Sequence, residues 1–168
     1  MKSVLFESRS EAETDRLGAV LATVLPDDIN IVIGLNGTLG AGKTRLVQAV
    51  ASAAGIDRKD VTSPTFVLCQ QYYGKRMIFH LDAYRIRDDD EFLELGVDEI
   101  FAMPALVFVE WADRVKNCLP PTRVDVTVSL TPDDNRLFEI FDRQSASSNL
   151  LSSIERSLAS EQREDRAK

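Results

Sequence analysis

The apolar positions of the chain change from helical spacing to unbroken runs and back, which predicts helices alternating with buried strands. A helix that begins at Ser8 or Ser10 has an apolar stripe at three- and four-residue spacing and ends at Pro26. The apolar run Ile31–Leu35 predicts a strand. The helical spacing returns over Lys43–Ala54, where Gly55 follows as a stop.

Farther along, the pattern predicts two antiparallel hairpins with a buried strand between them. The hairpins pair Phe66–Tyr73 with Met77–Asp82 across Gly74-Lys75, and Val124–Leu130 with Arg136–Phe141 across a Pro-Asp-Asp-Asn turn. An acidic entry leads into a helical stretch that Gly96 breaks. The run Ala105–Val109 then predicts a strand buried on both faces, and a short helix up to Cys118 follows.

The segment GTLGAGKT between the first predicted strand and the second helix matches the phosphate-binding pattern G-x-x-x-x-G-K-[ST]. Main-chain amides of such a loop converge on phosphate oxygens, and the following helix adds the positive end of its dipole. Lys43 is expected to reach the β- and γ-phosphates, and the Thr44 hydroxyl to bind Mg²⁺. The candidate nucleotide-binding residues are Gly37, Thr38, Leu39, Gly40, Ala41, Gly42, Lys43 and Thr44.

Together these elements predict an α/β, P-loop NTPase-like fold of three layers, with a mixed sheet that has a parallel core and antiparallel hairpins. Residues 1–143 are expected to form the P-loop domain and residues 144–168 a tail. Four apolar tail residues predict a short amphipathic helix: Leu150, Leu151, Ile154 and Leu158. Disorder is expected beyond about Ser160.

Composition restricts the possible partners and the compartment. The chain has 168 residues, a net charge of −7 and an isoelectric point near 4.8, so it has no bulk attraction for nucleic acid. Its two cysteines, Cys69 and Cys118, indicate free thiols in a reducing compartment. The N-terminus lacks the apolar core of a signal peptide, and no apolar run is long enough to span a membrane. We therefore expect a cytoplasmic protein.

Hydrolysis at such a loop needs further groups, and three residues are candidates. Asp82 and Glu110 each end a predicted strand, and ligands of open α/β sheets bind beyond the carboxyl ends of parallel strands. The strand of Asp82 belongs to a predicted hairpin, so the sequence leaves its direction in the sheet open. Glu110 is the candidate second magnesium ligand beside Thr44. Thr65, in the hydroxyl-rich loop Thr62–Phe66, is the candidate γ-phosphate sensor, although a Ser-Pro-Thr turn that starts a strand explains the loop equally well.

Other residues leave both a functional and a structural interpretation open. His80 lies on the same strand face as Asp82, yet a packed or hydrogen-bonded strand histidine is the more ordinary explanation. Trp111 is either a stacking platform or a core residue, and Arg85 either a phosphate contact or a surface arginine. The adenine edge is assigned, as a guess, to Phe6–Ser10 and Pro132–Asn135. The chain contains no N-K-x-D motif for reading guanine.

Five motifs in order resemble the TsaE (YjeE) family of bacterial ATPases. They are G-x-L-G-A-G-K-T, T-S-P-T-F, H-x-D-x-Y-R, E-L-G-x-D-E and V-E-W-A-D-R, and the similarity covers about residues 8–141. One departure is visible, because the family usually has Asp at the second loop position, where this chain has Thr38. The loss of that carboxylate is expected to alter the hydrolysis rate without changing the phosphate-binding backbone.

The resemblance implies a Mg²⁺-dependent ATPase subunit that serves the tRNA threonylcarbamoyladenosine modification. It would act with the TsaB and TsaD proteins and meet tRNA indirectly through their complex, without contacting membranes or DNA. It also places Asp82 and Thr65 in the catalytic environment, gives Thr44 and Glu110 the Mg²⁺, and implies a functional role for Trp111. The sequence leaves two alternatives: a P-loop kinase that phosphorylates a small molecule, and an ATP-gated adaptor that does not hydrolyse ATP.

Overall fold

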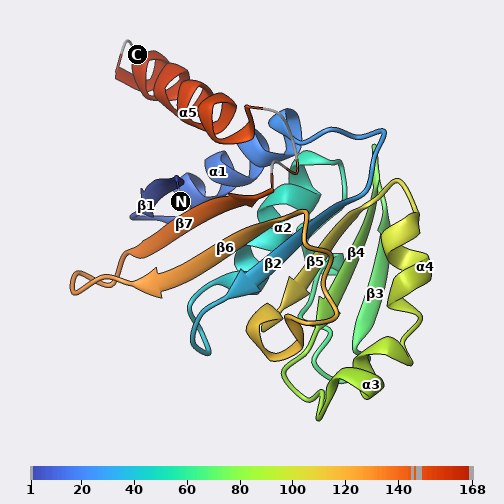
Figure 1. The fold of residues 1–168 in the computed structure, drawn as a ribbon. Helices are drawn as coiled ribbons and strands as arrows, with labels where there is room; N and C mark the ends of the chain where they lie inside the picture. Colours follow the sequence, from blue (N-terminus) through green and yellow to red (C-terminus); the bar gives the residue numbers. More distant parts are fainter. Residues whose placement is uncertain (1, 145, 147–148, 167–168) are drawn as a thin grey trace.

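The computed structural model describes residues 2–144, 146 and 149–166, with side chains through Ser160, and shows one sheet between two layers of helices (Figure 1). The strands are β1 (Ser3–Ser8), β2 (Ile31–Asn36), β3 (Cys69–Tyr73), β4 (Met77–Asp82), β5 (Leu106–Glu110), β6 (Arg123–Leu130) and β7 (Arg136–Arg143). The helices are α1 (Glu11–Val24), α2 (Lys43–Ala53), α3 (Asp89–Leu93), α4 (Val97–Ala102) and α5 (Leu150–Arg166), with short 3₁₀ turns η1 (Arg58–Asp60) and η2 (Ala112–Val115).

The sheet has seven strands in the order β1-β7-β6-β2-β5-β4-β3. β2 pairs in parallel with both β5 and β6, and β4 pairs in parallel with β5. The pairs β3–β4, β6–β7 and β1–β7 are antiparallel. This arrangement confirms the predicted α/β class with a parallel core and attached hairpins.

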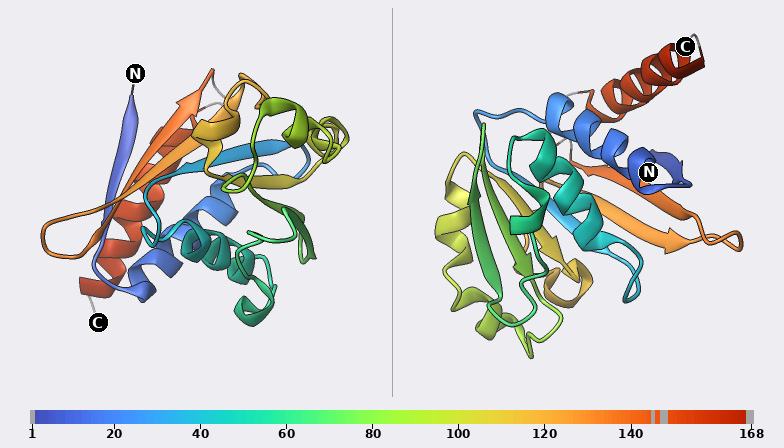
Figure 2. Two further views of the ribbon diagram at one scale, coloured as in Figure 1. Left: turned by 90° about the horizontal axis from the view of Figure 1, so that it is seen from below. Right: turned by 180° about the vertical axis from the view of Figure 1, so that it is seen from behind.

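Alternating side chains of the central strands supply the cores on the two sides of the sheet. In β2, Ile31, Ile33 and Leu35 belong to the core formed with α1, α2 and α5, whereas Val32 belongs to the core formed with α3, α4 and η2. Views from below and behind show these two helical layers (Figure 2). Because both faces are covered, the parallel strands are apolar almost throughout, as burial on two sides requires.

The first helix is defined by its caps. The Ser10 hydroxyl accepts a hydrogen bond from the Glu13 amide at 3.2 Å, while the Glu13 carboxylate accepts one from the Arg9 amide at 2.7 Å. The first contact satisfies an amide that the helix N-terminus leaves unpaired, and the second joins the residue before the cap to the first turn. The helix therefore begins after Ser10, the second of the two predicted starts.

The sequence missed one strand and misplaced the start of another. β1 was not predicted; its alternating burial arises only against its antiparallel partner β7, far away in sequence. The predicted strand from Phe66 is wrong at its start, since β3 begins at Cys69. Residues before it form a turn in which the Leu68 amide bonds the Pro64 carbonyl at 2.7 Å, and Phe66 is 81% exposed.

The C-terminal helix is longer than predicted and joins the main core. Leu150, Ile154 and Leu158 are buried in the core shared with α1 and α2. The backbone of α5 continues to Arg166 through residues with good helix propensity, including Glu and Arg. Residues 167 and 168 of the expected disordered end lie outside the described residues.

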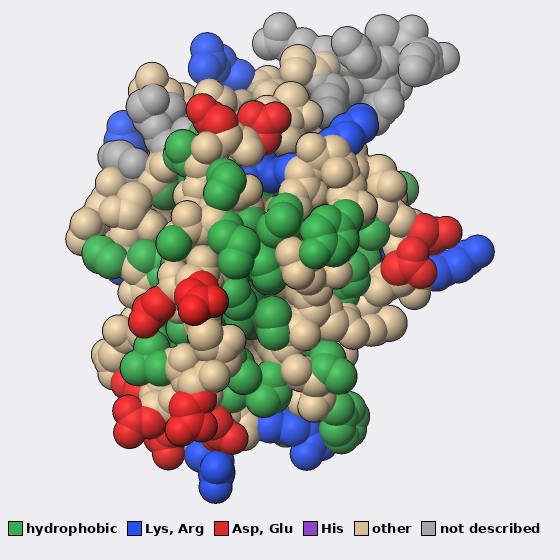
Figure 3. Space-filling view, turned by 90° about the vertical axis from the view of Figure 1, so that its right-hand side faces the viewer, with side chains coloured by type: hydrophobic (Ala, Val, Ile, Leu, Met, Phe, Trp, Pro, Cys, Tyr) green, Lys and Arg blue, Asp and Glu red, His purple; other side chains and the backbone are tan. Residues whose placement is uncertain are grey.

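On the side where β3, α3 and α4 lie, hydrophobic side chains gather in the middle of the surface (Figure 3). Acidic side chains gather at the lower left of this face, and Lys and Arg side chains lie along the bottom. No helix among the described residues is both long and apolar enough to cross a membrane.

Candidate active site

The phosphate-loop segment leaves β2 at the edge where the parallel strands end and enters α2 at Lys43. Gly37 has a φ of +140°, and a Cβ on it would lie 2.3 Å from the Val128 carbonyl oxygen of β6. Only glycine allows this approach. Gly42 is the N-cap of α2 and provides no capping side chain, so no side chain competes with a ligand for the first-turn amides.

Lys43 lies almost fully buried, with its ammonium at the loop. Its Nζ donates to the Gly37 carbonyl at 2.7 Å and the Thr38 carbonyl at 3.0 Å, and it lies 3.9 Å from the centre of the Trp111 ring. Burial lowers the pKa of Lys43, and the negative charges of Glu110 and Asp82 oppose that shift. A cation is thus placed where incoming phosphate oxygens would compensate its burial.

The two predicted acids are brought together at the ends of β4 and β5. Asp82 and Glu110 are direct register partners on these parallel strands, and both are buried. The pairing settles the direction of the Asp82 strand, which the sequence left open. The Thr44 hydroxyl donates to Glu110 Oε1 at 2.7 Å, so the two proposed magnesium ligands are adjacent.

The loop Thr62–Phe66 contacts Asp82 through two hydroxyl groups. Thr65 Oγ1 and Ser63 Oγ donate to Asp82 Oδ2 at 3.0 and 2.9 Å, and the two hydroxyls lie 2.8 Å apart. The main-chain amide of Tyr84 donates to Asp82 Oδ1 at 2.8 Å. Asp82 therefore joins this loop to the edge of the sheet, and Thr65, the candidate γ-phosphate sensor, lies beside it.

The aromatic and cationic candidates differ in their placement. Trp111 follows Glu110 with a φ of +57°, and its ring lies 5.0 Å from that of Tyr84, beside Lys43. Trp111 thus lines the pocket that these residues surround, and it also packs against the core formed with α3, α4 and η2. Arg85 lies over the Phe66 ring at 4.4 Å and does not line this pocket.

These groups surround a pocket of about 470 Å³. Its walls include the phosphate loop and six functional side chains: Lys43, Thr44, Ser63, Thr65, Asp82 and Glu110. Leu39 is exposed at its rim, whereas Ala41 is fully buried beneath the loop. Among the described residues, no group of three or more His, Cys, Asp or Glu side chains is placed to hold a metal. The oxygens of Thr44 and Glu110 nevertheless fit Mg²⁺, which prefers few protein ligands together with phosphates and water.

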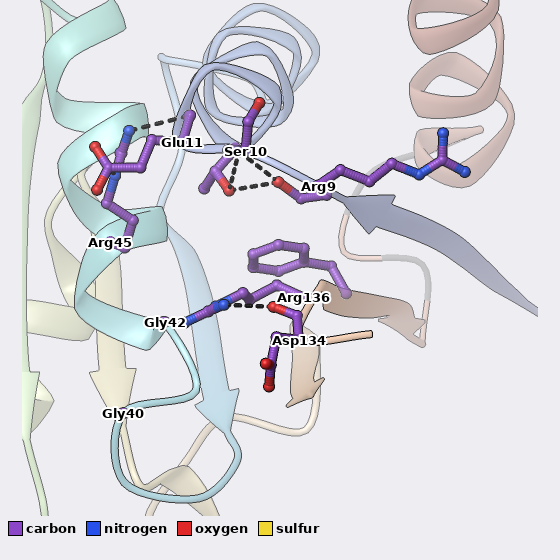
Figure 4. Close-up of a pocket in the computed structure, with 11 residues that line it drawn as sticks. Arg9, Ser10, Glu11, Gly40, Gly42, Arg45, Asp134 and Arg136 are labelled. Atoms are coloured by element: carbon purple, nitrogen blue, oxygen red, sulfur yellow. Dashed lines mark hydrogen bonds and ion pairs between the residues drawn. The ribbon is translucent and has the colours of Figure 1, made fainter. Parts of the chain in front are cut away.

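A second pocket of about 360 Å³ lies on the other side of the loop (Figure 4). It is bounded by Ser8–Glu11, by Asp134 and Arg136 near the β6–β7 turn, and by Gly40 and Gly42. The structure therefore brings together the two segments that the sequence proposed for the adenine edge. Arg45 lines both pockets and is fixed by Asp15 at 2.7 Å.

Sequence reasoning missed two contributors to the site. Ser63 shares Asp82 with Thr65, and its signal was its place in the same hydroxyl-rich loop. Asn36 ends β2 and accepts a hydrogen bond from the Asp113 amide at 2.9 Å, which fixes the segment after Glu110. Its signal was the strand end that it shares with the two acids.

Comparison with known proteins identifies relatives of this arrangement. The family model described as threonylcarbamoyl adenosine biosynthesis protein TsaE matches residues 8–138. Proteins named tRNA threonylcarbamoyladenosine biosynthesis protein TsaE are similar: that of Treponema pallidum is 35% identical over 77% of this chain and 93% of its own. That of Bacillus subtilis is 35% identical over 81% and 84%. The crystal structure of Bacillus subtilis YdiB superposes with a TM-score of 0.76 at 26% identity, covering 92% of this chain and 95% of the other. The chain therefore belongs to the TsaE family, as its five motifs predict.

Proposed function

We propose that this protein is a Mg²⁺-dependent ATPase that serves tRNA threonylcarbamoyladenosine biosynthesis together with TsaB and TsaD. Its membership of the TsaE family supports the pathway. The ATPase activity is inferred mainly from one observation: the Thr44 hydroxyl at the start of α2 lies 2.7 Å from the Glu110 carboxylate. Both residues line the same pocket as Lys43 and the glycine loop. A phosphate-binding loop next to a pair of oxygen ligands is what a magnesium–triphosphate complex requires.

In this proposal, separate residues of the chain bind the phosphates and the magnesium ion. Loop amides and Lys43 bind the β- and γ-phosphates, and Thr44 and Glu110 hold Mg²⁺. Bound Mg²⁺ neutralises charge that develops on the phosphate oxygens. Asp82 is suited to orient the attacking water, but its Oδ2 is now bonded by Ser63 and Thr65. Among the described residues, only the Tyr84 amide donates to its Oδ1, so that oxygen keeps an acceptor position for a water molecule.

The second pocket is the proposed site for the nucleoside part of ATP. It shares Gly40, Gly42 and Arg45 with the phosphate pocket, so one molecule reaches both. The side chain and main chain of Ser10 and the Asp134–Arg136 turn supply polar groups at its rim (Figure 4). Polar groups of both donor and acceptor type suit a purine edge.

Protein partners suit the surface better than direct nucleic-acid contact. The net charge is −7, and the face shown in Figure 3 presents a central group of apolar side chains with acidic and basic side chains around it. The negative net charge disfavours a tRNA backbone, whereas the apolar centre of this face suits contact with a protein. We therefore propose that TsaD and TsaB are the contacts and that tRNA is met only through them.

Phosphate release from ATP, measured with no acceptor present, tests this function. We expect slow Mg²⁺-dependent release that rises when TsaB and TsaD are added. Strict dependence on an added metabolite would instead show a small-molecule kinase. Partner binding that requires ATP but is accompanied by no phosphate release in the wild type would show a non-hydrolytic adaptor. Loss of partner-stimulated release in Asp82→Ala, with ATP binding retained, would exclude that adaptor.

A further inference from the structure

One buried histidine contacts the proposed magnesium ligand. His80 lies in the middle of β4, where its register partners are Phe108 of β5 and Gln70 of β3. Its side chain is 0% exposed, and Nε2 lies 2.8 Å from Glu110 Oε1. The same carboxylate oxygen accepts the Thr44 hydroxyl. Glu110 Oε1 is therefore held from two sides, by the β4 imidazole and by the first turn of α2.

The hydrogen-bonding state of His80 is set by this contact. A carboxylate oxygen only accepts, so Nε2 carries the proton that is donated to Glu110. The other ring nitrogen, Nδ1, is buried and has no hydrogen-bond partner among the described residues. An unpaired buried nitrogen costs free energy, and an apolar side chain would fill this position without that cost. Packing alone thus does not account for a histidine here.

The charge of Lys43 indicates where the Glu110 carboxylate would be drawn if the His80 contact were removed. Burial lowers the pKa of Lys43, and among the negative charges that oppose this shift Glu110 has the largest effect. If Glu110 lost the His80 hydrogen bond, the Thr44 hydroxyl and the field of the Lys43 ammonium would be left to attract its carboxylate. An ion pair between Glu110 and Lys43 would remove an oxygen from Mg²⁺ and a cation from the phosphates.

We infer that His80 is a positioning residue that holds the Glu110 carboxylate beside Thr44 and away from Lys43. This inference rests on the proposed function, because it assigns His80 a role in magnesium affinity. Groups that orient a metal ligand from behind typically change metal affinity 10- to 100-fold. The ATP site without magnesium depends on the loop and Lys43, so it is expected to change little.

Three variants separate this role from a packing role. His80→Phe keeps a ring of similar shape and removes the hydrogen bond, whereas His80→Gln keeps an N–H group near the position of Nε2. Phe79→Leu is the control, because Phe79 is a buried neighbour on β4 whose side chain belongs to the opposite core. If His80→Phe does not fold, His80→Asn replaces it, since its amide is too short to reach Glu110.

The readouts are ATP affinity by calorimetry in EDTA and the Mg²⁺ concentration for half-maximal change in fluorescence of the single tryptophan, Trp111. We expect His80→Phe to raise the Mg²⁺ midpoint about tenfold and to leave affinity in EDTA within about twofold. His80→Gln should restore most of the loss, and Phe79→Leu should change neither value.

The inference is overturned if His80→Phe leaves the Mg²⁺ midpoint unchanged or lowers ATP affinity equally with and without Mg²⁺. It is also overturned if the Mg²⁺ midpoint of His80→Gln is no lower than that of His80→Phe. Failure of the proposed function gives a different result: wild-type protein would then bind no ATP, or would bind it without any response to Mg²⁺.

Discussion

Replacing Gly37 with alanine tests the geometry of the loop most sharply. The new Cβ would lie 2.3 Å from the Val128 carbonyl oxygen and 3.2 Å from its carbon, and both are backbone atoms of β6. A Cβ also makes a φ of +140° unfavourable. Gly40→Ala is the matched control in the same loop: its φ is +77°, and a Cβ there meets nothing within 4 Å.

The two substitutions differ in the overlap with β6 and in the backbone region. Gly40→Ala carries the cost of a left-handed conformation, about 1–2 kcal/mol. For Gly37→Ala, the strained backbone costs about 1–3 kcal/mol. The steric overlap with β6 costs a similar amount, because β6 cannot move freely. We expect Gly37→Ala to be about 2–3 kcal/mol less stable than Gly40→Ala, a difference of roughly 5–10 °C in Tm for a chain of this size.

Urea unfolding followed by circular dichroism gives both free energies of unfolding, and calorimetry gives ATP affinity. Gly37→Ala should lose stability, affinity or both, since relief of the overlap displaces the loop from β6. Equal stability of the two variants together with wild-type ATP affinity in Gly37→Ala would refute the reasoning from loop geometry.

Three further predictions concern other parts of the chain. Lys43→Ala should weaken ATP binding at least about 30-fold, because a charge-assisted contact to phosphate is lost; unchanged calorimetric affinity would contradict this. Burial alone would raise the pKa of Asp15, but hydrogen bonds from Arg58 and Arg45 hold it below its ordinary 3.8. Its contribution to stability is then present above pH 3.8 and lost as the pH falls through the folded pKa. Asp15→Asn should therefore cost about 1 kcal/mol at pH 7 after allowance for solvent screening, and urea unfolding at pH 7 and 3 should show this cost shrinking; a constant cost would argue against the ion pairs. Burial raises the pKa of Cys69 above 9.0, so its alkylation rate should reach half its maximum above pH 9, and a midpoint below that would be contrary.

Local patterns were enough to predict the central part of the fold. The phosphate loop, the strand before it and the helix after it are continuous in sequence, and their spacing alone predicts their arrangement. The unbroken run before Glu110 predicted a strand covered on both faces, and β5 is buried throughout. Placement of Glu110 at the edge of the sheet followed from the rule for parallel strands. The placement of Asp82 beside it depends on the parallel pairing of β4 with β5, which the sequence did not predict.

The features that the sequence did not predict depend on contacts between distant residues. β1 is short and pairs only with β7 at the other end of the domain, so its amphipathic alternation was overlooked. The backbone turns at Leu68, which has a φ of +65°, so β3 begins only at Cys69. The residues of this turn, Phe66 and Val67 among them, have high strand propensity, which is why the predicted strand began too early. The contact between His80 and Glu110 joins residues 30 positions apart and exists because β4 lies beside β5 in one register.

The central claim is that the loop over α2, together with Thr44 and Glu110, holds a magnesium–triphosphate complex. A crystal structure with Mg²⁺ and a non-hydrolysable ATP analogue measures this directly. We expect the triphosphate within the amides of Gly37–Thr44, Lys43 beside the β- and γ-phosphates, and Mg²⁺ on the Thr44 hydroxyl with the Glu110 carboxylate next to it. A triphosphate bound elsewhere, or a loop left empty at saturating analogue with Lys43 still against the Trp111 ring, would contradict the account.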